Sequence, residues 1–97
     1  MAAIYQSAIF RKWLSGLKDV QAKAAIGRRI ERAEGGNFGD CKLVGNGVSE
    51  MRIKVGPGYR VYFVRRGERV YLLLLGGDKS SQAGDIKAAK KMAAELE

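Results

Sequence analysis

The 97-residue chain contains no histidine, a single cysteine, a single proline and no long run of apolar residues. The missing histidines exclude the usual zinc ligands, the serine- and cysteine-type triads and the paired-histidine mechanism of nucleases. The lone Cys41 excludes an intramolecular disulfide and a thiolate-only metal site, and it fits a reducing compartment. No segment approaches the roughly 20 apolar residues that span a bilayer, and the N-terminus has no signal-peptide pattern. We therefore expect a cytoplasmic protein without a metal, another cofactor or a membrane contact.

Positive charge is what the chain has in excess, with 18 lysines and arginines against 10 acidic residues and a formal net charge of +8. This balance favours an anionic partner, either a nucleic acid or an acidic protein, because counterion release contributes affinity that does not depend on sequence. The length is that of one domain, residues 1–97, which can bury somewhat over half of its unfolded surface without disulfides.

Two short segments, 48–55 and 59–63, alternate apolar and polar residues in the way that is typical of strands with one buried side. The opposite side carries mainly cations and one tyrosine. The residues on that polar side are Glu50, Arg52, Lys54, Arg60 and Tyr62. Basic residues on an exposed sheet face often serve only to prevent aggregation, but their density here favours binding of a phosphate-rich ligand.

Apolar periodicity, turn residues and helix caps predict the remaining elements. We expect strands at 2–6, 40–44 and 70–75, helices at 8–17, 19–34 and 82–96, and a loop at 76–81. The unbroken apolar run at 70–75 predicts a strand that is buried on both faces at the centre of the sheet. The fold class is α+β, with two N-terminal helices and a C-terminal helix packed on one face of a small, twisted, mainly antiparallel sheet.

If the hairpins pair in sequence order, Arg52, Lys54 and Arg60 converge on one side of the sheet, and Lys79 joins them from the following loop. Such a cluster suits metal-free cleavage of RNA, in which the 2′-hydroxyl attacks the neighbouring phosphorus and negative charge grows on the nonbridging oxygens. Arginine offers a planar, permanently charged fork for those oxygens, and we expect Arg60 to stabilise the charge. Lysine is a base only when its surroundings lower its pKa, and Lys54 is the best-placed candidate.

Several segments also resemble, in order, the RelE/ParE superfamily of toxin–antitoxin toxins. The resemblance is to its addiction-module killer-protein branch, which is related to HigB toxins, and it covers nearly the whole chain. The segments that carry it are 10–14, 36–40, 45–53, 56–63, 74–82 and Asp85-Ile86. It implies a small α+β toxin that a cognate antitoxin neutralises, in a possible hetero-oligomer with it. RelE-like members are ribosome-dependent mRNA endonucleases, so the resemblance also implies contacts with mRNA on the ribosome and with rRNA.

Matched by strand position, the catalytic lysine pair of RelE falls on Arg52 and Lys54, and its strand arginine falls on Arg60. The arginine of its following loop corresponds most nearly to Lys79, and its catalytic tyrosine to Asp85. Arg52 keeps the charge of a lysine but cannot give up a proton, and the histidines of HigB toxins have no counterpart. The general acid and base therefore stay unassigned.

Three further side chains are candidate RNA contacts, namely Tyr62, Arg66 and Asp85. The leading hypothesis is a ribosome-dependent, metal-independent mRNA endonuclease that inhibits translation. Two alternatives remain open. One is a ParE-like inhibitor of DNA gyrase without nuclease activity, and the other is a regulator that binds DNA together with the antitoxin.

Overall fold

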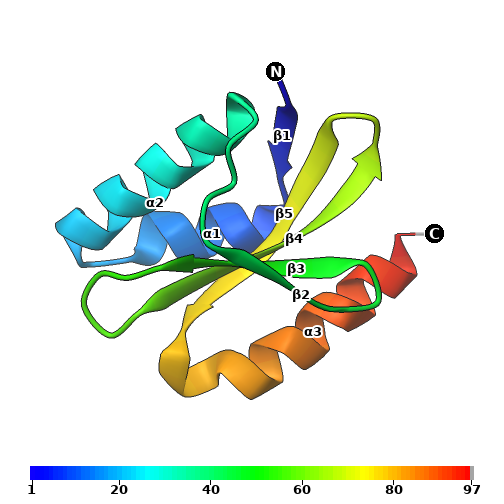
Figure 1. Cartoon of the computed structure of the whole chain (residues 1–97). Coiled ribbons are helices and arrows are strands. Elements are labelled where there is room, and N and C mark those ends of the chain that lie inside the picture. The colour runs from blue at the N-terminus through cyan, green and yellow to red at the C-terminus, as the bar shows by residue number, and fades with distance from the viewer. Residues whose placement is uncertain (97) are drawn as a thin grey trace.

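The computed structural model describes residues 1–96 as one five-stranded sheet with three α-helices and a short 3-10 helix (Figure 1). The strands are β1 (Ala3–Gln6), β2 (Cys41–Gly45), β3 (Val48–Ile53), β4 (Tyr59–Gly67) and β5 (Val70–Asp78). The helices are α1 (Ala8–Gly16), α2 (Val20–Glu34), η1 (Lys79–Ser81) and α3 (Gln82–Glu95). The strand order is β1-β5-β4-β3-β2, with β1 parallel to β5 and all other neighbours antiparallel. The predicted α+β class and the mainly antiparallel sheet are confirmed.

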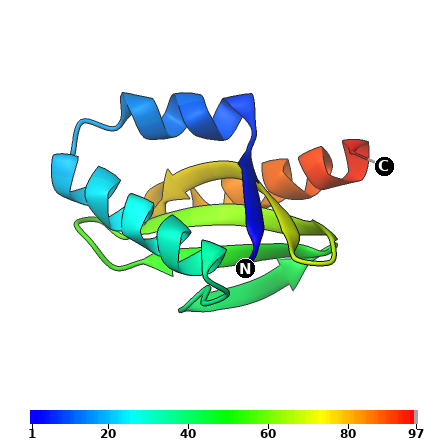
Figure 2. The same cartoon turned by 90° about the horizontal axis from the view of Figure 1, so that it is seen from above.

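The helices cover both faces of the sheet, whereas the sequence led us to expect all of them on one face. Figure 1 shows α2 above the strands and α3 below them, and Figure 2 shows α1 and α2 from a second direction. One core contains Phe10 of α1 and Ile26 of α2, and the other contains Ala89 of α3 and Tyr62 of β4. The reason lies in β4, whose run from Val61 to Val64 is apolar at every position and so needs cover on both sides.

Strand β5 is longer than predicted, because it runs through Gly76 and Gly77 to Asp78 instead of ending in a loop. A Cβ atom on Gly76 would overlap the Trp13 ring, and one on Gly77 would overlap the Asp85 carboxylate. The two glycines thus let α1 and α3 approach opposite faces of the same strand. Burial of β5 on both faces is confirmed, but β4 occupies the middle of the sheet.

Helix α2 begins after Asp19, whose carboxylate accepts a hydrogen bond of 3.1 Å from the amide of Ala22 and so caps the helix. Ala22 and Ala25 are buried, whereas Val20 and Ala24 are exposed.

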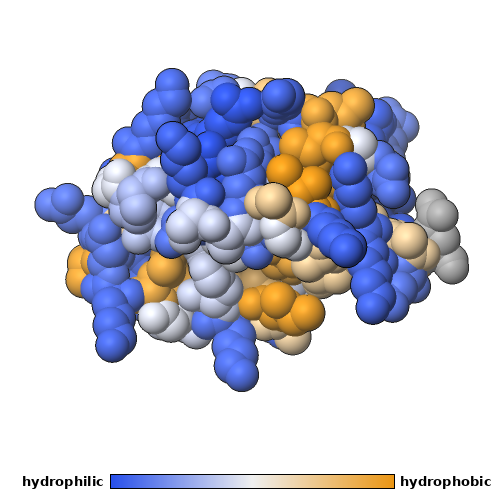
Figure 3. Space-filling model, turned by 90° about the horizontal axis from the view of Figure 1, so that it is seen from below, coloured by the Kyte–Doolittle hydropathy of each residue, from blue (hydrophilic) through white to orange (hydrophobic). Residues whose placement is uncertain are grey.

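No helix within residues 1–96 is long and apolar enough to cross a membrane. Seen from the side of α3, the surface is mostly hydrophilic, with hydrophobic atoms in separate patches (Figure 3).

Candidate cationic site around a buried glutamate

The centre of the cationic surface is a buried carboxylate, that of Glu50 on β3, whose side chain is 1% exposed. Four side chains from three elements contact its two oxygens. They are Arg52 (Nε to Oε1, 3.2 Å), Arg60 (Nε to Oε2, 3.5 Å), Tyr62 (hydroxyl to Oε2, 3.1 Å) and Gln82 (Nε2 to Oε2, 2.9 Å). We call these five residues the Glu50 cluster. A buried carboxylate is stable only when it is paired and hydrogen-bonded, and here it is both.

Strand register explains why these side chains meet. Glu50 pairs with Tyr62 and Arg52 pairs with Arg60 across β3 and β4. Residues two apart on a strand share a face, so the four side chains occupy adjacent positions on the α3 side of the sheet. Gln82, the first residue of α3, completes the cluster from the α3 side of the sheet. The predicted convergence of Arg52 and Arg60 is thus present, but it is organised by an acid.

The two arginines present their guanidinium groups in a fixed orientation. Each directs Nε toward Glu50, and no hydrogen bond within residues 1–96 engages their terminal amino groups. The side chain of Arg52 is 35% exposed and that of Arg60 is 14% exposed. The contact of Arg60 with Glu50 is an ion pair without a hydrogen bond, because its buried Nε atom has no hydrogen-bond partner in the described part of the chain. The terminal amino groups of both arginines retain donors that a phosphate can accept.

Tyr62 lies on the predicted face, but its side chain is fully buried under α3. Burial, reinforced by the neighbouring charge of Glu50, raises the pKa of the Tyr62 hydroxyl well above its ordinary value. The tyrosine is therefore a neutral donor to Glu50. A ring enclosed in this way offers no face for a base to stack on.

Asp85 forms one wall of the same region, in the first turn of α3. Its Oδ2 atom accepts a hydrogen bond of 2.6 Å from the Ser81 hydroxyl and lies directly against the backbone of Gly77. Because Gly77 is the cross-strand partner of Arg60, Asp85 is a neighbour of the Glu50 cluster. A carboxylate at this point limits the positive charge on that side and is a poor RNA contact on electrostatic grounds.

Lys54 and Lys79 are exposed and lie on either side of the turn between β3 and β4. Lys54 directly follows the end of β3, so it begins that turn instead of continuing the strand face. The amide of Lys79 donates a hydrogen bond of 2.9 Å to the carbonyl of Gly58 at the other end of the turn. The structure brings both lysines to the β3–β4 turn, next to Arg60, but reveals no contact between their ammonium groups and the cluster.

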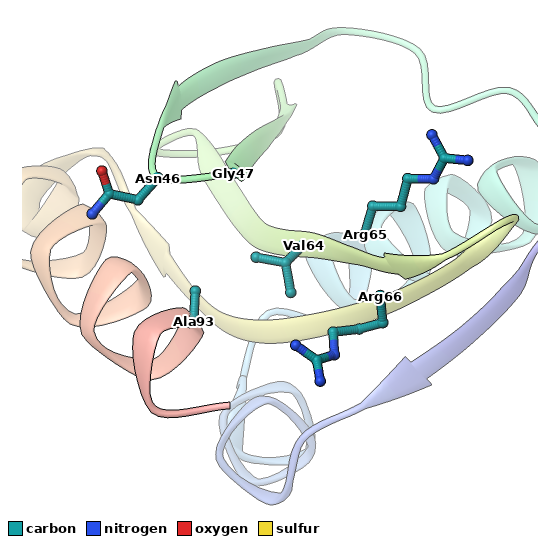
Figure 4. A pocket seen from close by; sticks show the side chains of 6 residues that line it. All are labelled: Asn46, Gly47, Val64, Arg65, Arg66 and Ala93. Carbon is teal, nitrogen blue, oxygen red and sulfur yellow. The ribbon is translucent and has the colours of Figure 1, made fainter. Parts of the chain in front are cut away.

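Arg66 lies away from the other predicted site residues. It is six positions beyond Arg60 on β4, which corresponds to about 20 Å along the strand. Its Nη2 atom donates a hydrogen bond of 3.3 Å to the carbonyl of Leu96, after the end of α3. Figure 4 shows Arg66 and Arg65 leaving β4 in different directions, around a small pocket that also includes Ala93. The structure does not place Arg66 in the Glu50 cluster.

Some contributors have no role predicted from the sequence. Glu50 is the one acid on the predicted polar side, and its alternation with Arg52 is the available signal. Arg29 of α2 holds the backbone on the other face of the sheet, beneath the site. Its guanidinium group donates to the carbonyls of Arg52, Phe38 (3.0 Å) and Asp40 (3.2 Å), and burial lowers its pKa. The position of an arginine on a helix does not predict hydrogen bonds of this kind, which reach carbonyl groups far away in the sequence.

Comparison with known proteins places most of the chain in one protein family. Residues 12–96 match the family described as Phage derived protein Gp49-like (DUF891), a family that is associated with toxins of toxin–antitoxin systems. A protein of Haemophilus influenzae, described only as uncharacterized, is 53% identical over 87 residues, which span 90% of this chain and 88% of the relative. The family match over residues 12–96 includes all five residues of the Glu50 cluster.

Proposed function

The chain belongs to the Gp49-like family of phage-derived proteins, and from this membership we propose that it is the toxin of a toxin–antitoxin pair. We further propose that it cleaves mRNA on the ribosome without a metal ion and that a cognate antitoxin neutralises it. Family membership supports the first step, and the chemistry of the Glu50 cluster supports the second.

The observation that carries the nuclease proposal is the shared attachment of Arg52 and Arg60 to one buried carboxylate. Two fixed guanidinium groups with free terminal donors match the nonbridging oxygens of a phosphodiester. One carboxylate against two arginines leaves a net positive charge, so an incoming phosphate is attracted even though Glu50 is near. Lys54 and Lys79 add positive charge at the turn where the RNA backbone would approach.

In the proposed reaction the 2′-oxygen of a ribose forms a bond to the adjacent phosphorus, and the bond from phosphorus to the 5′-oxygen breaks. The 2′-hydroxyl proton passes to solvent water and the leaving 5′-oxygen takes a proton from solvent water, so the products are a 2′,3′-cyclic phosphate and a 5′-hydroxyl. Negative charge on the nonbridging oxygens rises toward the transition state. Arg60 and Arg52 stabilise this charge without moving, because Glu50 already fixes their orientation. Glu50 and Tyr62 are positioning residues in this scheme, since both are buried.

The proposed partners follow from the charge. With a net charge of +8, the chain would bind rRNA around the decoding site and an acidic segment of the antitoxin through the same electrostatic attraction. An antitoxin that covers the Arg52–Arg60 surface would block phosphate access directly.

Brief induction of the toxin in growing cells, followed by primer extension on abundant transcripts, tests the proposal. We expect discrete breaks within translated frames, their loss when translation initiation is blocked, and their loss when the antitoxin is co-expressed. Growth arrest with intact transcripts would reject the nuclease while leaving the toxin assignment in place.

A gyrase inhibitor without its own chemistry is the second candidate. It is favoured by the lack of histidine and by the enclosure of Tyr62, since both deprive the cluster of an obvious proton donor. This reading predicts a DNA-damage response and accumulation of cleaved DNA bound to gyrase after induction, with mRNA left whole.

A further inference from the structure

A second candidate site lies on the α2 face of the sheet, whereas the Glu50 cluster lies on the α3 face. A pocket of about 400 Å³ opens between the N-terminal residues, the loop after α2 and the β4–β5 hairpin. Its lining residues are Met1, Ala2, Gly36, Phe38, Arg69 and Tyr71. The hairpin begins seven positions after Arg60 on β4, which corresponds to more than about 20 Å along the strand. The pocket is therefore separate from the site proposed above.

Backbone hydrogen bonds hold the walls of this pocket together. The amide of Ala2 donates to the carbonyl of Glu34 (2.7 Å), and the amide of Ala3 donates to the carbonyl of Arg69 (2.8 Å). These bonds tie the start of the chain to the end of α2 on one side and to the hairpin on the other. A pocket with tethered walls exists before a ligand arrives, which lowers the entropic cost of binding.

The floor of the pocket is aromatic and its rings are fixed. Phe38 stacks on Phe63 with ring centroids 5.0 Å apart and 21° between the planes. Phe38 also contacts Tyr71, with centroids 4.6 Å apart and a tilt of 56°. Phe38 and Tyr71 are both only partly buried and both line the pocket, so ring surface remains available to a ligand. A planar, unsaturated group such as a nucleobase stacks well on such a surface.

A cationic group stands beside this aromatic floor. Arg69 is exposed and lines the pocket. The nearby carboxylates, Glu34 and Glu68, are not among the lining residues. A guanidinium group next to exposed aromatic rings selects a ligand with a flat ring and an adjacent negative charge.

We propose that this pocket binds one nucleotide of a single-stranded RNA, with the base on Phe38 and Tyr71 and the phosphate at Arg69. The volume of about 400 Å³ falls in the lower part of the range of small-molecule sites, as a single nucleotide requires. This inference deepens the proposed function, on which it rests for the identity of the RNA. It adds a contact that would hold a transcript or ribosomal strand away from the reacting phosphate.

The test uses the full chain labelled with ¹⁵N, titrated with uridine, inorganic phosphate and uridine monophosphate in separate experiments. We expect the nucleotide to shift the amide signals of Gly36, Phe38 and Tyr71 more than the nucleoside or phosphate does, because only the nucleotide fills both parts of the pocket. Shifts confined to the Glu50 cluster, or equal shifts from phosphate alone, would overturn the proposal.

A matched pair of variants adds an affinity measurement with a fluorescent uridine hexamer. Arg69 adopts a positive φ of 59°, so Arg69→Asn removes the charge while keeping a residue that tolerates this backbone. Arg11→Asn removes the same charge from an exposed position on α1 that lines neither site. We expect Arg69→Asn to weaken binding about fivefold to tenfold and Arg11→Asn to change it less than about twofold. Equal losses would mean nonspecific attraction and reject the site. Intact cellular mRNA would reject the nuclease without affecting this binding measurement.

Discussion

Arg52 and Arg60 are direct cross-strand partners in β3 and β4, and both point Nε at the carboxylate of Glu50. Like charges opposite each other destabilise a strand pair, so this pairing needs the buried acid beneath it. The same acid forms ion pairs with both guanidinium groups. Glu50 therefore offsets the repulsion between the two arginines and, at the same time, holds them together as a surface that can bind an anion.

The role of Glu50 as an organiser predicts a loss of stability in Glu50→Gln. The substitution removes the charge that compensates two arginines but keeps nearly the same shape, so packing is preserved. Because the arginines are partly exposed, we expect a decrease of about 1–3 kcal/mol in the free energy of unfolding, below the value for a fully buried pair. Urea denaturation measures it, with the exposed Glu31→Gln as control. Equal stability of the two variants would show that Glu50 is not needed to hold the cluster.

Arg60 should dominate activity, since its guanidinium group is the more enclosed of the two. We expect Arg60→Ala to lower mRNA cleavage at least about 100-fold, as removal of one transition-state donor does in other enzymes, while the fold is retained. Arg66→Ala, which removes the same charge from the other end of β4, should leave cleavage within about threefold. Circular dichroism checks the fold, and primer extension after induction checks the activity. Full growth arrest and cleavage by Arg60→Ala would contradict the assignment.

Much of the fold could be predicted because alternation and turn residues act locally. The β2–β3 hairpin is one example, since Asn46 and Gly47 both adopt the positive φ that an Asn-Gly turn between two strands favours. The placement of α3 was missed because periodicity defines which side of a helix is apolar but not which face of a sheet it meets. The end of β5 was missed because Gly76 and Gly77 suggest a loop when their neighbours in space are unknown.

The candidate site was predicted only in part for the same reason. Parity along β3 and β4 correctly placed Arg52 and Arg60 on one face, because strand geometry repeats every two residues. The burial of Tyr62 depends on α3, which packs there from 20 residues later in the chain. Contacts of this kind, like that of Gln82 with Glu50, are set by tertiary packing and leave no local pattern.

The hydrogen bond from Tyr62 to Glu50 predicts a dependence of stability on alkaline pH. The folded state raises the pKa of the hydroxyl, so above the ordinary tyrosine value of about 10 the folded chain holds a proton that the unfolded chain has lost. Stability should therefore be unaffected by this group well below about pH 10 and should fall as the pH rises above about 10 toward the raised pKa of the folded state. Tyr62→Phe should weaken this dependence, and at neutral pH it should cost about 1–2 kcal/mol through the lost hydrogen bond. Denaturation at several pH values measures both effects. Tyr5→Phe, at an exposed position, is the control and should retain the slope.

The close approach of α3 to β5 makes Gly77 a sensitive position. A Cβ atom there would overlap the Asp85 carboxylate and lie 2.9 Å from the Ser81 hydroxyl, so Gly77→Ala must move these two side chains, which share a hydrogen bond at the start of α3. The same turn carries Gln82, which donates to Glu50, so the change should also loosen the cluster. We expect a loss of about 1–3 kcal/mol in the free energy of unfolding, together with reduced cleavage. Gly84→Ala is the matched control, because a Cβ atom on Gly84 meets no atom within 4 Å and alanine favours helix by up to about 1 kcal/mol. If both variants were as stable and as active as the unmodified chain, the contact between α3 and β5 would not position the site.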